Sequence, residues 1–215
     1  MHIADIRREY SLAGLRRADL DADPIAQFQK WFRQATQALA QKEIDVNAAT
    51  LATADKQGKP SARIVLLKGL DERGFIFFTN YASRKGRELA ENPNASLVFY
   101  WQQLERQVCV AGLVKKISRA ESEKYFKSRP RDSRLAAWAS NQSDVVKDRT
   151  ALEAKWNEMS SKFPGEEIPL PPDWGGYGLK PERIEFWQGR PGRLHDRFQY
   201  TRQKNNSWKM ERLAP

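Results

Sequence analysis

A run of short, β-rich segments between Asn47 and Ser118 constrains the fold more than any other feature of the chain. It comprises AATLATAD, SARIVLLKGLD, FIFFTN, ASLVFYW and ERQVCVAGLVKKIS, whose β-branched and aromatic residues favour strands. Polar or glycine-containing turns such as KQGKP separate them, so the connections are short and antiparallel pairing is expected. Roughly five consecutive strands of this kind favour a closed or partly closed barrel.

Helical patterns before, between and after these strands predict the α+β class. The first helix is expected to start at Asp23-Pro24, with Pro24 in a tolerated first-turn position. The N-caps expected for the later helices are Ser83, Ser118, Asp132 or Ser133, and Asp144. Three further β segments follow, and Asn205-Asn206 predicts a hairpin between the last two. We expect residues 1–22 to form a mobile arm and residues 23–215 a single domain.

The chain is strongly basic, which invites a nucleic-acid interpretation. Its 37 lysines and arginines against 27 aspartates and glutamates give a formal net charge of +10 over 215 residues. Many of these cations, however, stand singly inside apolar or aromatic stretches, as in RIVLLK, FKSRPRDS and GRLHDRF. Solvated basic arms have contiguous charges without such anchors. We therefore expect pockets for small anions and no nucleic-acid partner.

Composition excludes several other classes. Cys109 is the single cysteine, which excludes an intramolecular disulfide and a cysteine-based zinc site and fits a reducing, cytoplasmic location. Only two histidines are present, so we predict no metal site. No apolar run approaches the ~18–20 residues of a membrane helix. The charged start MHIADIRREY lacks the apolar stretch of an export signal, so neither export nor membrane insertion is expected.

Ser83-Arg84-Lys85 places two cations in the first turn of a predicted helix. The positive end of the helix dipole disfavours each of them by ~0.3–1 kcal/mol. A bound anion would reverse this, whereas two solvent-exposed cations on a surface helix are the alternative. Arg63 and Lys68, at the ends of RIVLLK, would face opposite sides of a regular strand. They are either charges that extend into solvent or ligands of two different anions.

Residues 125–133 combine a phenol, cations and hydroxyl groups around a proline. Tyr125 and Arg129 share one helical face at i, i+4. Ser133 is expected to open the next helix, at a position that receives anions. The set suggests a pocket for a phosphate ester, with a helical hairpin that has a solvated basic face as the alternative.

The segment LHDRF would place Arg193, His195 and Arg197 on one face of a strand. Three cationic or titratable groups on one face suggest a site, although a lone histidine is usually structural. Because Asp196 would point away from His195, no Ser-His-Asp triad is implied. Neutral partners for a heterocycle, or ordinary surface residues, are Gln107, Gln142 and Ser143.

Taken in order, eight motifs resemble those of the pyridoxine/pyridoxamine 5′-phosphate oxidase family. They are RIVLLK, FFTN-x-x-SRK, ERQV, YFxSRPRDS, NQS, PxxWGG, IEFWQG-x-x-x-RLHDR and the terminal RLAP. The resemblance extends from Ile6 to Pro215, and SRPRDS and RLHDR are its most specific parts. It implies a mostly antiparallel split β-barrel with flanking helices, a homodimer, and FMN bound at the interface between the subunits. Position 78 is Phe where some members carry Tyr, so a contact there would be apolar or through the backbone.

The resemblance also implies roles for individual residues. The FMN-binding set would be Arg63, Ile64, Val65, Leu66, Leu67, Lys68, Phe78, Thr79, Arg84, Lys85, Gln107, Gln142, Ser143, Trp187 and Arg197, with Arg84 and Lys85 on the flavin phosphate. The substrate-binding set would be Arg7, Tyr10, Lys68, Tyr125, Arg129, Ser133, Arg193 and His195. Within it, the substrate phosphate would contact Lys68, Tyr125, Arg129 and Ser133. Arg193 and His195 would be the catalytic residues over the pyridine ring, and the arm with Arg7 and Tyr10 would close over the substrate.

The implied reaction is oxidation of the 4′ carbon of pyridoxamine or pyridoxine 5′-phosphate to pyridoxal 5′-phosphate. The flavin would accept a hydride, and O2 would reoxidise it to give hydrogen peroxide. Three alternatives stay open: an oxidase of another substrate such as a phenazine precursor, a module that holds flavin or pyridoxal phosphate without turnover, and a nucleic-acid binder. The cluster over residues 125–133 favours a phosphorylated substrate over the first. Peroxide formation would exclude the second, and only steeply salt-dependent binding to DNA or RNA would support the third.

Overall fold

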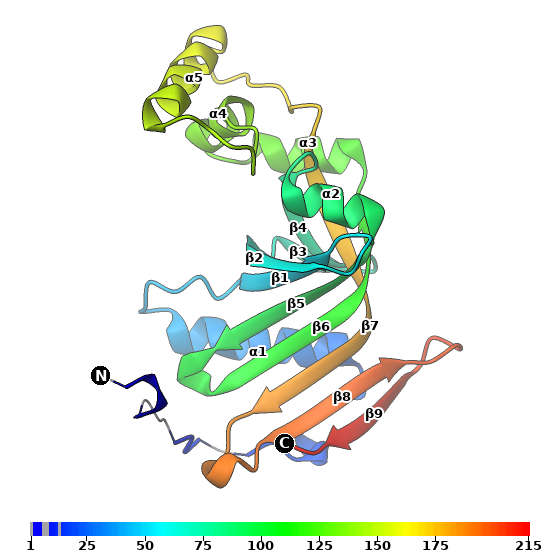
Figure 1. Ribbon diagram of the computed structural model, residues 1–215. Coiled ribbons are helices and arrows are strands. Elements are labelled where there is room, and N and C mark those ends of the chain that lie inside the picture. The colour runs from blue at the N-terminus through cyan, green and yellow to red at the C-terminus, as the bar shows by residue number, and fades with distance from the viewer. Residues whose placement is uncertain (1, 6–8, 13) are drawn as a thin grey trace. The chain divides into compact units, whose positions relative to one another are not determined.

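The computed structural model describes residues 2–5, 9–12 and 14–215, and Figure 1 shows their helices and strands. The helices are α1 (Pro24–Leu39), α2 (Arg84–Glu91), α3 (Arg119–Lys127), α4 (Arg131–Ala139) and α5 (Arg149–Lys162), with 3₁₀ turns η1 (Ile3–Asp5), η2 (Arg17–Asp19), η3 (Gln102–Leu104) and η4 (Pro191–Arg193). The strands are β1 (Ala48–Ala54), β2 (Pro60–Leu66), β3 (Gly69–Asp71), β4 (Gly74–Asn80), β5 (Asn94–Trp101), β6 (Arg106–Lys116), β7 (Trp174–Gln188), β8 (Asp196–Arg202) and β9 (Trp208–Leu213). Over these residues, no helix is long and apolar enough to cross a membrane.

The chain divides into two compact units. The α1 unit comprises residues up to Leu51 with Ser96–Gly112 and Pro181–Pro215, and the α2 unit comprises Ala52–Ala95 with Leu113–Lys180. The described strands form one nine-stranded sheet in the order β2-β1-β5-β6-β7-β4-β3, to which β8 is added beside β7 and β9 beside β8. This curled sheet with its helices is an α+β split barrel, which confirms the predicted fold class.

Helix α1 forms as predicted, because Asp23 and Pro24 define its start. The Asp23 carboxylate accepts a hydrogen bond from a first-turn N–H at 3.0 Å, and Pro24 occupies a position whose N–H needs no helical partner. Within the α1 unit, the ring centroids of Phe28 and Phe99 in β5 lie 5.0 Å apart. The buried face of the helix consists of Pro24, Gln27, Phe28, Trp31, Ala35 and Leu39.

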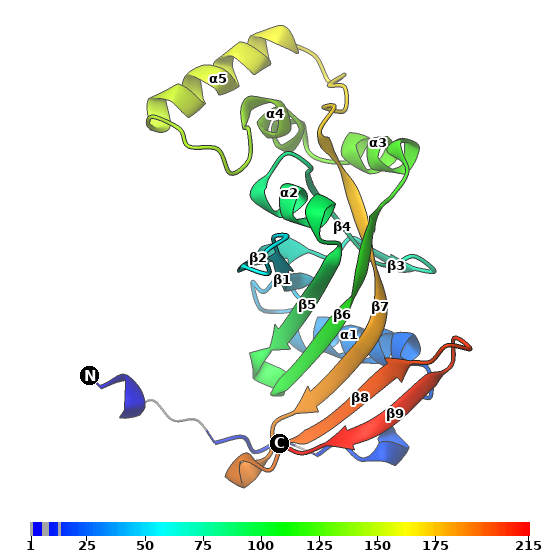
Figure 2. The ribbon, with the colours of Figure 1, turned by 45° about the vertical axis from the view of Figure 1, so that its right-hand side comes forward.

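Strands β8 and β9 form the predicted C-terminal hairpin in the α1 unit (Figure 2). Asn206 adopts a left-handed φ of 65° in the turn, a conformation that Asn tolerates better than most residues. Phe198 and Tyr200 in β8 are buried on one face of the hairpin. The Tyr200 hydroxyl donates to the Asp21 carbonyl at 2.6 Å, so the hairpin also holds the chain just before α1.

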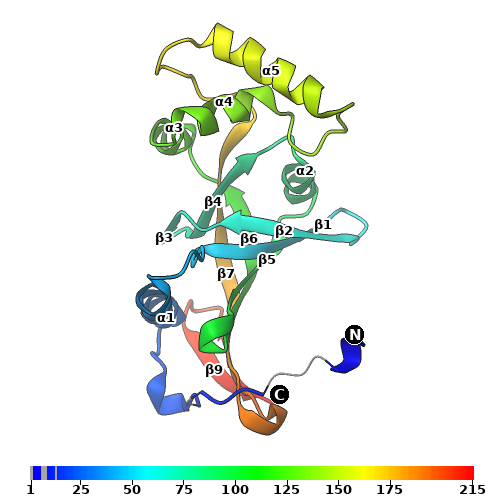
Figure 3. The same cartoon turned by 90° about the vertical axis from the view of Figure 1, so that its left-hand side faces the viewer.

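In the α2 unit, three helices and the start of β7 form an apolar core. Figure 3 shows α2 and α3 on opposite sides of β4. Strand β4 pairs antiparallel with β7, so that Phe78 stands opposite Gly176. A Cβ on Gly176 would lie 2.8 Å from the Phe78 ring, so this glycine provides the space that the ring occupies. The buried members of the core are Phe126, Leu135, Met159, Ile168, Leu170 and Trp174.

The predicted start of α4 is wrong. Its N-cap position is Pro130, which makes no side-chain capping bond. Asp132 and Ser133 already lie inside the first turn, because proline ends α3 and sets the extended backbone from which α4 begins. Ser133 is therefore the third residue of the helix and not its cap.

The predicted start of α5 is also wrong. Asp144 donates its backbone N–H to the Asn141 carbonyl at 3.1 Å, in a turn that precedes the helix. Asp148 is the N-cap, and its carboxylate accepts from a first-turn N–H at 2.8 Å. Val145 and Val146, which would belong to the helix if Asp144 capped it, lie before it and are exposed.

Candidate active site

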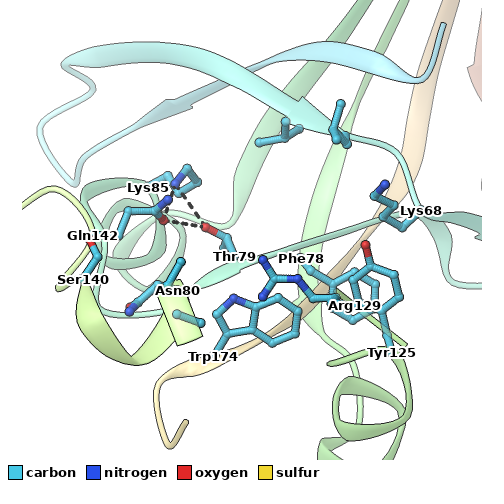
Figure 4. Close-up of a pocket in the computed structure, with 14 residues that line it drawn as sticks. Lys68, Phe78, Thr79, Asn80, Lys85, Tyr125, Arg129, Ser140, Gln142 and Trp174 are labelled. Carbon is cyan, nitrogen blue, oxygen red and sulfur yellow. Dashed lines mark hydrogen bonds between the residues drawn. The ribbon is translucent and has the colours of Figure 1, made fainter. Parts of the chain in front are cut away.

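A cavity of about 410 Å³ lies in the α2 unit, a size typical of small-molecule sites. Its walls come from β2 and the residues that follow it, β4, α2, α3, α4 and the start of β7. Nine residues predicted from the sequence line it: Val65, Leu66, Lys68, Phe78, Thr79, Lys85, Tyr125, Arg129 and Gln142. Figure 4 shows Lys85 and Gln142 at one end, Lys68 and Tyr125 at the other, and the Arg129 guanidinium between them.

Three stacked aromatic rings line the cavity. The Phe78 ring stacks on Tyr125 with centroids 3.9 Å apart and on Trp174 with centroids 5.5 Å apart. The interplanar angles are 22° and 13°, so the three rings are nearly parallel. Phe78 thus contributes an apolar face here, as expected for a residue without a phenolic hydroxyl. Stacked rings of this kind suit a planar heterocycle.

Lys85 brings a buried ammonium group to one end of the cavity. Its Nζ donates to Gln142 Oε1 at 2.9 Å and to Thr79 Oγ1 at 3.0 Å, and the residue is only 7% exposed. Burial, and after it the charge of Arg63, lowers the pKa of Lys85 to about 8, although Glu88 acts in the opposite direction. An anion in the cavity would therefore stabilise the charged form of this lysine.

Arg129 has a guanidinium nitrogen that is buried without a partner. Its Nη1 makes no hydrogen bond to the part of the chain that the structure describes. The guanidinium carbon lies 4.8 Å from the Trp174 ring centroid, and burial lowers the pKa of Arg129. An unsatisfied buried donor is costly, so this nitrogen suits an anionic acceptor. Tyr125 lines the same cavity, as the i, i+4 spacing indicates.

Lys68 does not continue strand β2. The strand ends at Leu66, and the Lys68 backbone N–H donates to the Ile76 carbonyl at 2.8 Å. The prediction that Arg63 and Lys68 occupy one regular strand is therefore wrong, because the chain leaves the strand between them. The lysine side chain lines the cavity, whereas Arg63 pairs with Glu88 at 3.2 Å.

Six predicted residues of the α2 unit do not line the cavity. Strand alternation leaves Ile64 64% exposed, between the half-buried Arg63 and the buried Val65. Arg84 pairs with Glu88 at 2.8 Å. The full set outside the cavity lining is Arg63, Ile64, Leu67, Arg84, Ser133 and Ser143.

In the α1 unit, Tyr10, Trp187 and His195 form a second cluster. The Tyr10 ring centroid lies 5.4 Å from those of Trp187 and His195, and Trp187 and His195 are 4.7 Å apart. The Arg190 backbone N–H donates to His195 Nδ1 at 3.1 Å. In a neutral imidazole the proton then resides on Nε2, which makes that nitrogen a donor.

Arg193 and His195 do not share a strand face with Arg197. Strand β8 begins at Asp196, and Arg193 belongs to the 3₁₀ turn η4. Gly192 and Arg193 both have left-handed φ, 63° and 61°, so the extended alternation on which the prediction depended is interrupted. The prediction of a common face is wrong for this backbone reason.

Arg197 and Gln107 also lie in the α1 unit. Arg197 donates to both carboxylate oxygens of Glu185, at 2.8 and 3.1 Å, and to the Ala214 carbonyl at 2.9 Å. Gln107 Nε2 lies 3.3 Å from the Cys109 sulfur. Burial raises the pKa of the Cys109 thiol to about 11, so this thiol stays protonated at neutral pH.

Two buried or half-buried carboxylates hold the described part of the N-terminal arm. Glu105 accepts from the backbone N–H groups of Ser11 and Leu12 at 3.1 and 3.0 Å. Asp196 accepts from the Leu15 N–H at 2.9 Å. These anchors hold the segment that directly follows Tyr10, whereas Arg7 lies outside the described residues.

The sequence analysis did not predict three residues that contribute to the cavity or to its surroundings. Trp174 stood within the PxxWGG motif, which was the signal for it. The only local signal for Glu88 was its i, i+4 spacing from Arg84, because its partner Thr53 is 35 residues away. Glu105 carried no local signal, because its partner Ser11 is 94 residues away.

Comparisons with known proteins identify similar proteins of one family over nearly the whole chain. Residues 34–163 match the family described as "Pyridoxamine 5'-phosphate oxidase", and residues 174–215 match "Pyridoxine 5'-phosphate oxidase C-terminal dimerisation region". A pyridoxine/pyridoxamine 5′-phosphate oxidase from Ralstonia nicotianae is 60% identical over 99% of both chains. One from Nostoc punctiforme is 56% identical over 99% of this chain and 98% of its own.

Solved structures show the same fold. The crystal structure of PhzG from Burkholderia lata 383, in complex with tetrahydrophenazine-1-carboxylic acid, is 34% identical with a TM-score of 0.87. It covers 97% of this chain and all of its own. A pyridoxamine 5′-phosphate oxidase-related, FMN-binding protein from Nostoc punctiforme, 20% identical, has a TM-score of 0.70 over 87% of this chain and 97% of its own.

Proposed function

Because the chain belongs to the pyridoxine/pyridoxamine 5′-phosphate oxidase family, a family of oxidoreductases, we propose that it oxidises pyridoxamine and pyridoxine 5′-phosphate to pyridoxal 5′-phosphate. FMN would be the cofactor, and O2 the electron acceptor that becomes hydrogen peroxide. The observation that carries the proposal is the cavity of the α2 unit. It combines stacked aromatic rings with cationic groups at both ends, an arrangement that suits planar, phosphorylated ligands.

The residues of the cavity fit the phosphate of FMN. The Lys85 amine contacts the neutral groups of Thr79, Ser83 and Gln142, so a phosphate there would bring an opposite charge into contact with it. The N-terminus of α2 adds its dipole to this attraction. We assign the flavin phosphate to Arg84 and Lys85, and the flavin ring system to residues 63–68 with Phe78 and Thr79.

The substrate phosphate would bind at Arg129. The buried, unpartnered Nη1 of this residue supports an anion there. Lys68 and Tyr125 line the same cavity and would contribute an ammonium and a hydroxyl group. Ser133 completes the proposed set from α4. Anchoring the phosphate away from the reacting carbon would convert binding energy into alignment of the ring.

When bound, FMN would supply the redox chemistry, by taking a hydride from the substrate and passing the electrons to O2. The chain's own residues orient the substrate and stabilise charge. Arg193 would fix the pyridine ring and favour loss of the hydride. His195 would donate a hydrogen bond from Nε2, because its Nδ1 already accepts one from the Arg190 N–H.

The assembly and the arm are part of the proposal. Residues 174–215 match a dimerisation region. This supports a homodimer with FMN at the subunit interface, where Gln107, Gln142, Ser143, Trp187 and Arg197 would complete the site. Residues 1–22 would act as a mobile arm in which Arg7 and Tyr10 close over the substrate. A single domain over residues 23–215 and a cytoplasmic location remain predictions from the sequence.

The visible spectrum and a peroxide assay test the proposal directly. Purified protein should be yellow with flavin absorbance, and it should form hydrogen peroxide when pyridoxamine 5′-phosphate is added. Unphosphorylated pyridoxamine is the matched control and should react much more weakly. A colourless protein that does not bind added FMN would contradict the proposal. A yellow protein that forms no peroxide would instead be a binding module.

FMN affinity is expected to fall as the pH rises through about 8, the pKa of Lys85. Above that pH the free protein holds a neutral Lys85, and a proton must be taken up for the ammonium to meet the phosphate. The phosphate is already a dianion over this range, so the lysine sets the slope, at most about tenfold per pH unit. Titrations of flavin fluorescence between pH 7 and 9 measure it. Lys85→Met should bind FMN more weakly and without this slope; an unchanged slope would exclude Lys85.

A further inference from the structure

Glu88 is a buried carboxylate that joins both arginines proposed to act on FMN. It lies one turn into α2, and its side chain is 7% exposed. Its Oε1 accepts from Arg84 Nε at 2.8 Å, and its Oε2 accepts from Arg63 Nη2 at 3.2 Å. Because Arg84 belongs to α2 and Arg63 to β2, Glu88 ties the two elements together at their charged groups.

Two hydroxyl groups fix the carboxylate. Thr53 Oγ1 and Ser61 Oγ each donate to Glu88 Oε2 at 2.5 Å. Arg63 in turn donates to both hydroxyl oxygens, so its guanidinium is held at three points. Burial alone would raise the pKa of Glu88, but the hydrogen bonds from Ser61, Thr53, Arg84 and Arg63 outweigh it and lower this pKa to about 2. Glu88 is therefore charged at neutral pH.

The charges around the start of α2 do not balance. Arg63, Arg84 and Lys85 are three cations and Glu88 is one anion, so the group carries three minus one, or +2. A phosphate monoester carries close to −2 at neutral pH. The exposed Arg87 of the same helix adds a further positive charge, so this end of α2 has an excess that a phosphate would offset, whereas a purely structural pair would need one cation for one carboxylate.

The Arg84 side chain is oriented so that it can bind a second partner besides Glu88. Glu88 binds this residue through Nε, which leaves the terminal Nη groups of a side chain that is 61% exposed for another acceptor. A guanidinium held on one edge is pre-organised for an anion on the other.

We propose that Glu88 is a positioning residue of the FMN phosphate site: Arg63, Thr53 and Ser61 fix its carboxylate, and the carboxylate holds Arg84 in the conformation that presents its terminal nitrogens to the phosphate. The inference rests on the proposed function, because it concerns the cofactor-binding step. It predicts that FMN affinity changes in the direction opposite to the one expected from charge alone. Removing an anion near a phosphate should strengthen binding by charge alone, whereas loss of positioning should weaken it.

Glu88→Gln tests the inference, because glutamine keeps the size of the side chain and removes its charge. Apoprotein is titrated with FMN and, separately, with riboflavin, which shares the ring system but lacks the phosphate. We expect FMN to bind about tenfold more weakly, which corresponds to the net value of one hydrogen bond to a charged group, and riboflavin to bind within twofold of its original affinity. Glu91→Gln removes the same charge from an exposed position of the same helix and should leave both affinities unchanged.

The possible results distinguish a failure of the inference about Glu88 from a failure of the proposed function. Equal weakening of both ligands means that Glu88 only supports the fold, and unchanged or tighter FMN binding means that Glu88 does not position Arg84; either result overturns the inference. If the original protein binds no FMN, the proposed function fails instead. A double-mutant cycle adds a second measurement, because Glu88→Gln should have little further effect on FMN affinity in an Arg84→Gln background. If Glu88→Gln does not fold, Glu88→Asp undergoes the same two titrations, and only an FMN-specific loss supports positioning.

Discussion

Arg193→Ala is expected to lower kcat/KM for pyridoxamine 5′-phosphate by about 10²–10³-fold while FMN stays bound, the usual cost of removing a donor that stabilises developing charge. Arg193 lies in the turn η4, two positions before His195, and its side chain is exposed. Alanine keeps the Cβ atom, so the strain at φ 61° is the same in both proteins. Initial rates of peroxide formation, with flavin absorbance recorded on the same samples, measure the effect.

Lys204→Ala is the matched control for this substitution. Lys204 is exposed in the turn between β8 and β9 of the same unit, so its loss removes one positive charge without touching the cluster of Tyr10, Trp187 and His195. Its turnover should be normal. If Arg193→Ala also turns over nearly normally with FMN bound, the catalytic role of Arg193 is excluded.

Local rules predicted much of the fold. Asp23 and Ser83 cap helices at the predicted positions. The Ser118 hydroxyl accepts a hydrogen bond from the Glu121 N–H at 3.2 Å and donates one to the Glu121 carboxylate. These features depend on neighbours within four residues, and so does the Asn206 turn. The same rules placed Tyr125 and Arg129 on one side of a helix, and both line the cavity.

The features that the sequence did not predict have a common physical origin, because each depends on backbone conformation or contacts that no local pattern reveals. Asp144 and Asp148 are equally good caps by residue type, and only the turn closed by Asn141 decides between them. The left-handed backbone at Arg193 is unusual for a residue other than glycine, so alternation could not reveal it. Glu88 bonds to Thr53, 35 residues away, and contacts of that range follow from the sheet and not from any local pattern.

Arg129→Ala is expected to raise KM for pyridoxamine 5′-phosphate by about 100-fold with a smaller change in kcat, because a charge-assisted contact to a desolvated phosphate contributes about 2–5 kcal/mol when one partner is removed. FMN affinity should be unaffected. The preference for pyridoxamine 5′-phosphate over unphosphorylated pyridoxamine should largely disappear, because Arg129 is proposed to bind the group that distinguishes them. Steady-state peroxide rates with both substrates measure this preference.

The same variant separates the proposed substrate from the one that the PhzG likeness suggests. PhzG was crystallised with tetrahydrophenazine-1-carboxylic acid, which carries a carboxylate and no phosphate. If the chain acted on such a compound, the unaltered protein would prefer it to pyridoxamine 5′-phosphate, and Arg129→Ala would not change a preference for phosphate. Lys127→Ala is the control, since it removes a charge two residues earlier that is 67% exposed and pairs with Glu123. Equal losses in Lys127→Ala and Arg129→Ala would mean that general electrostatic attraction, and not a phosphate site at Arg129, selects the substrate.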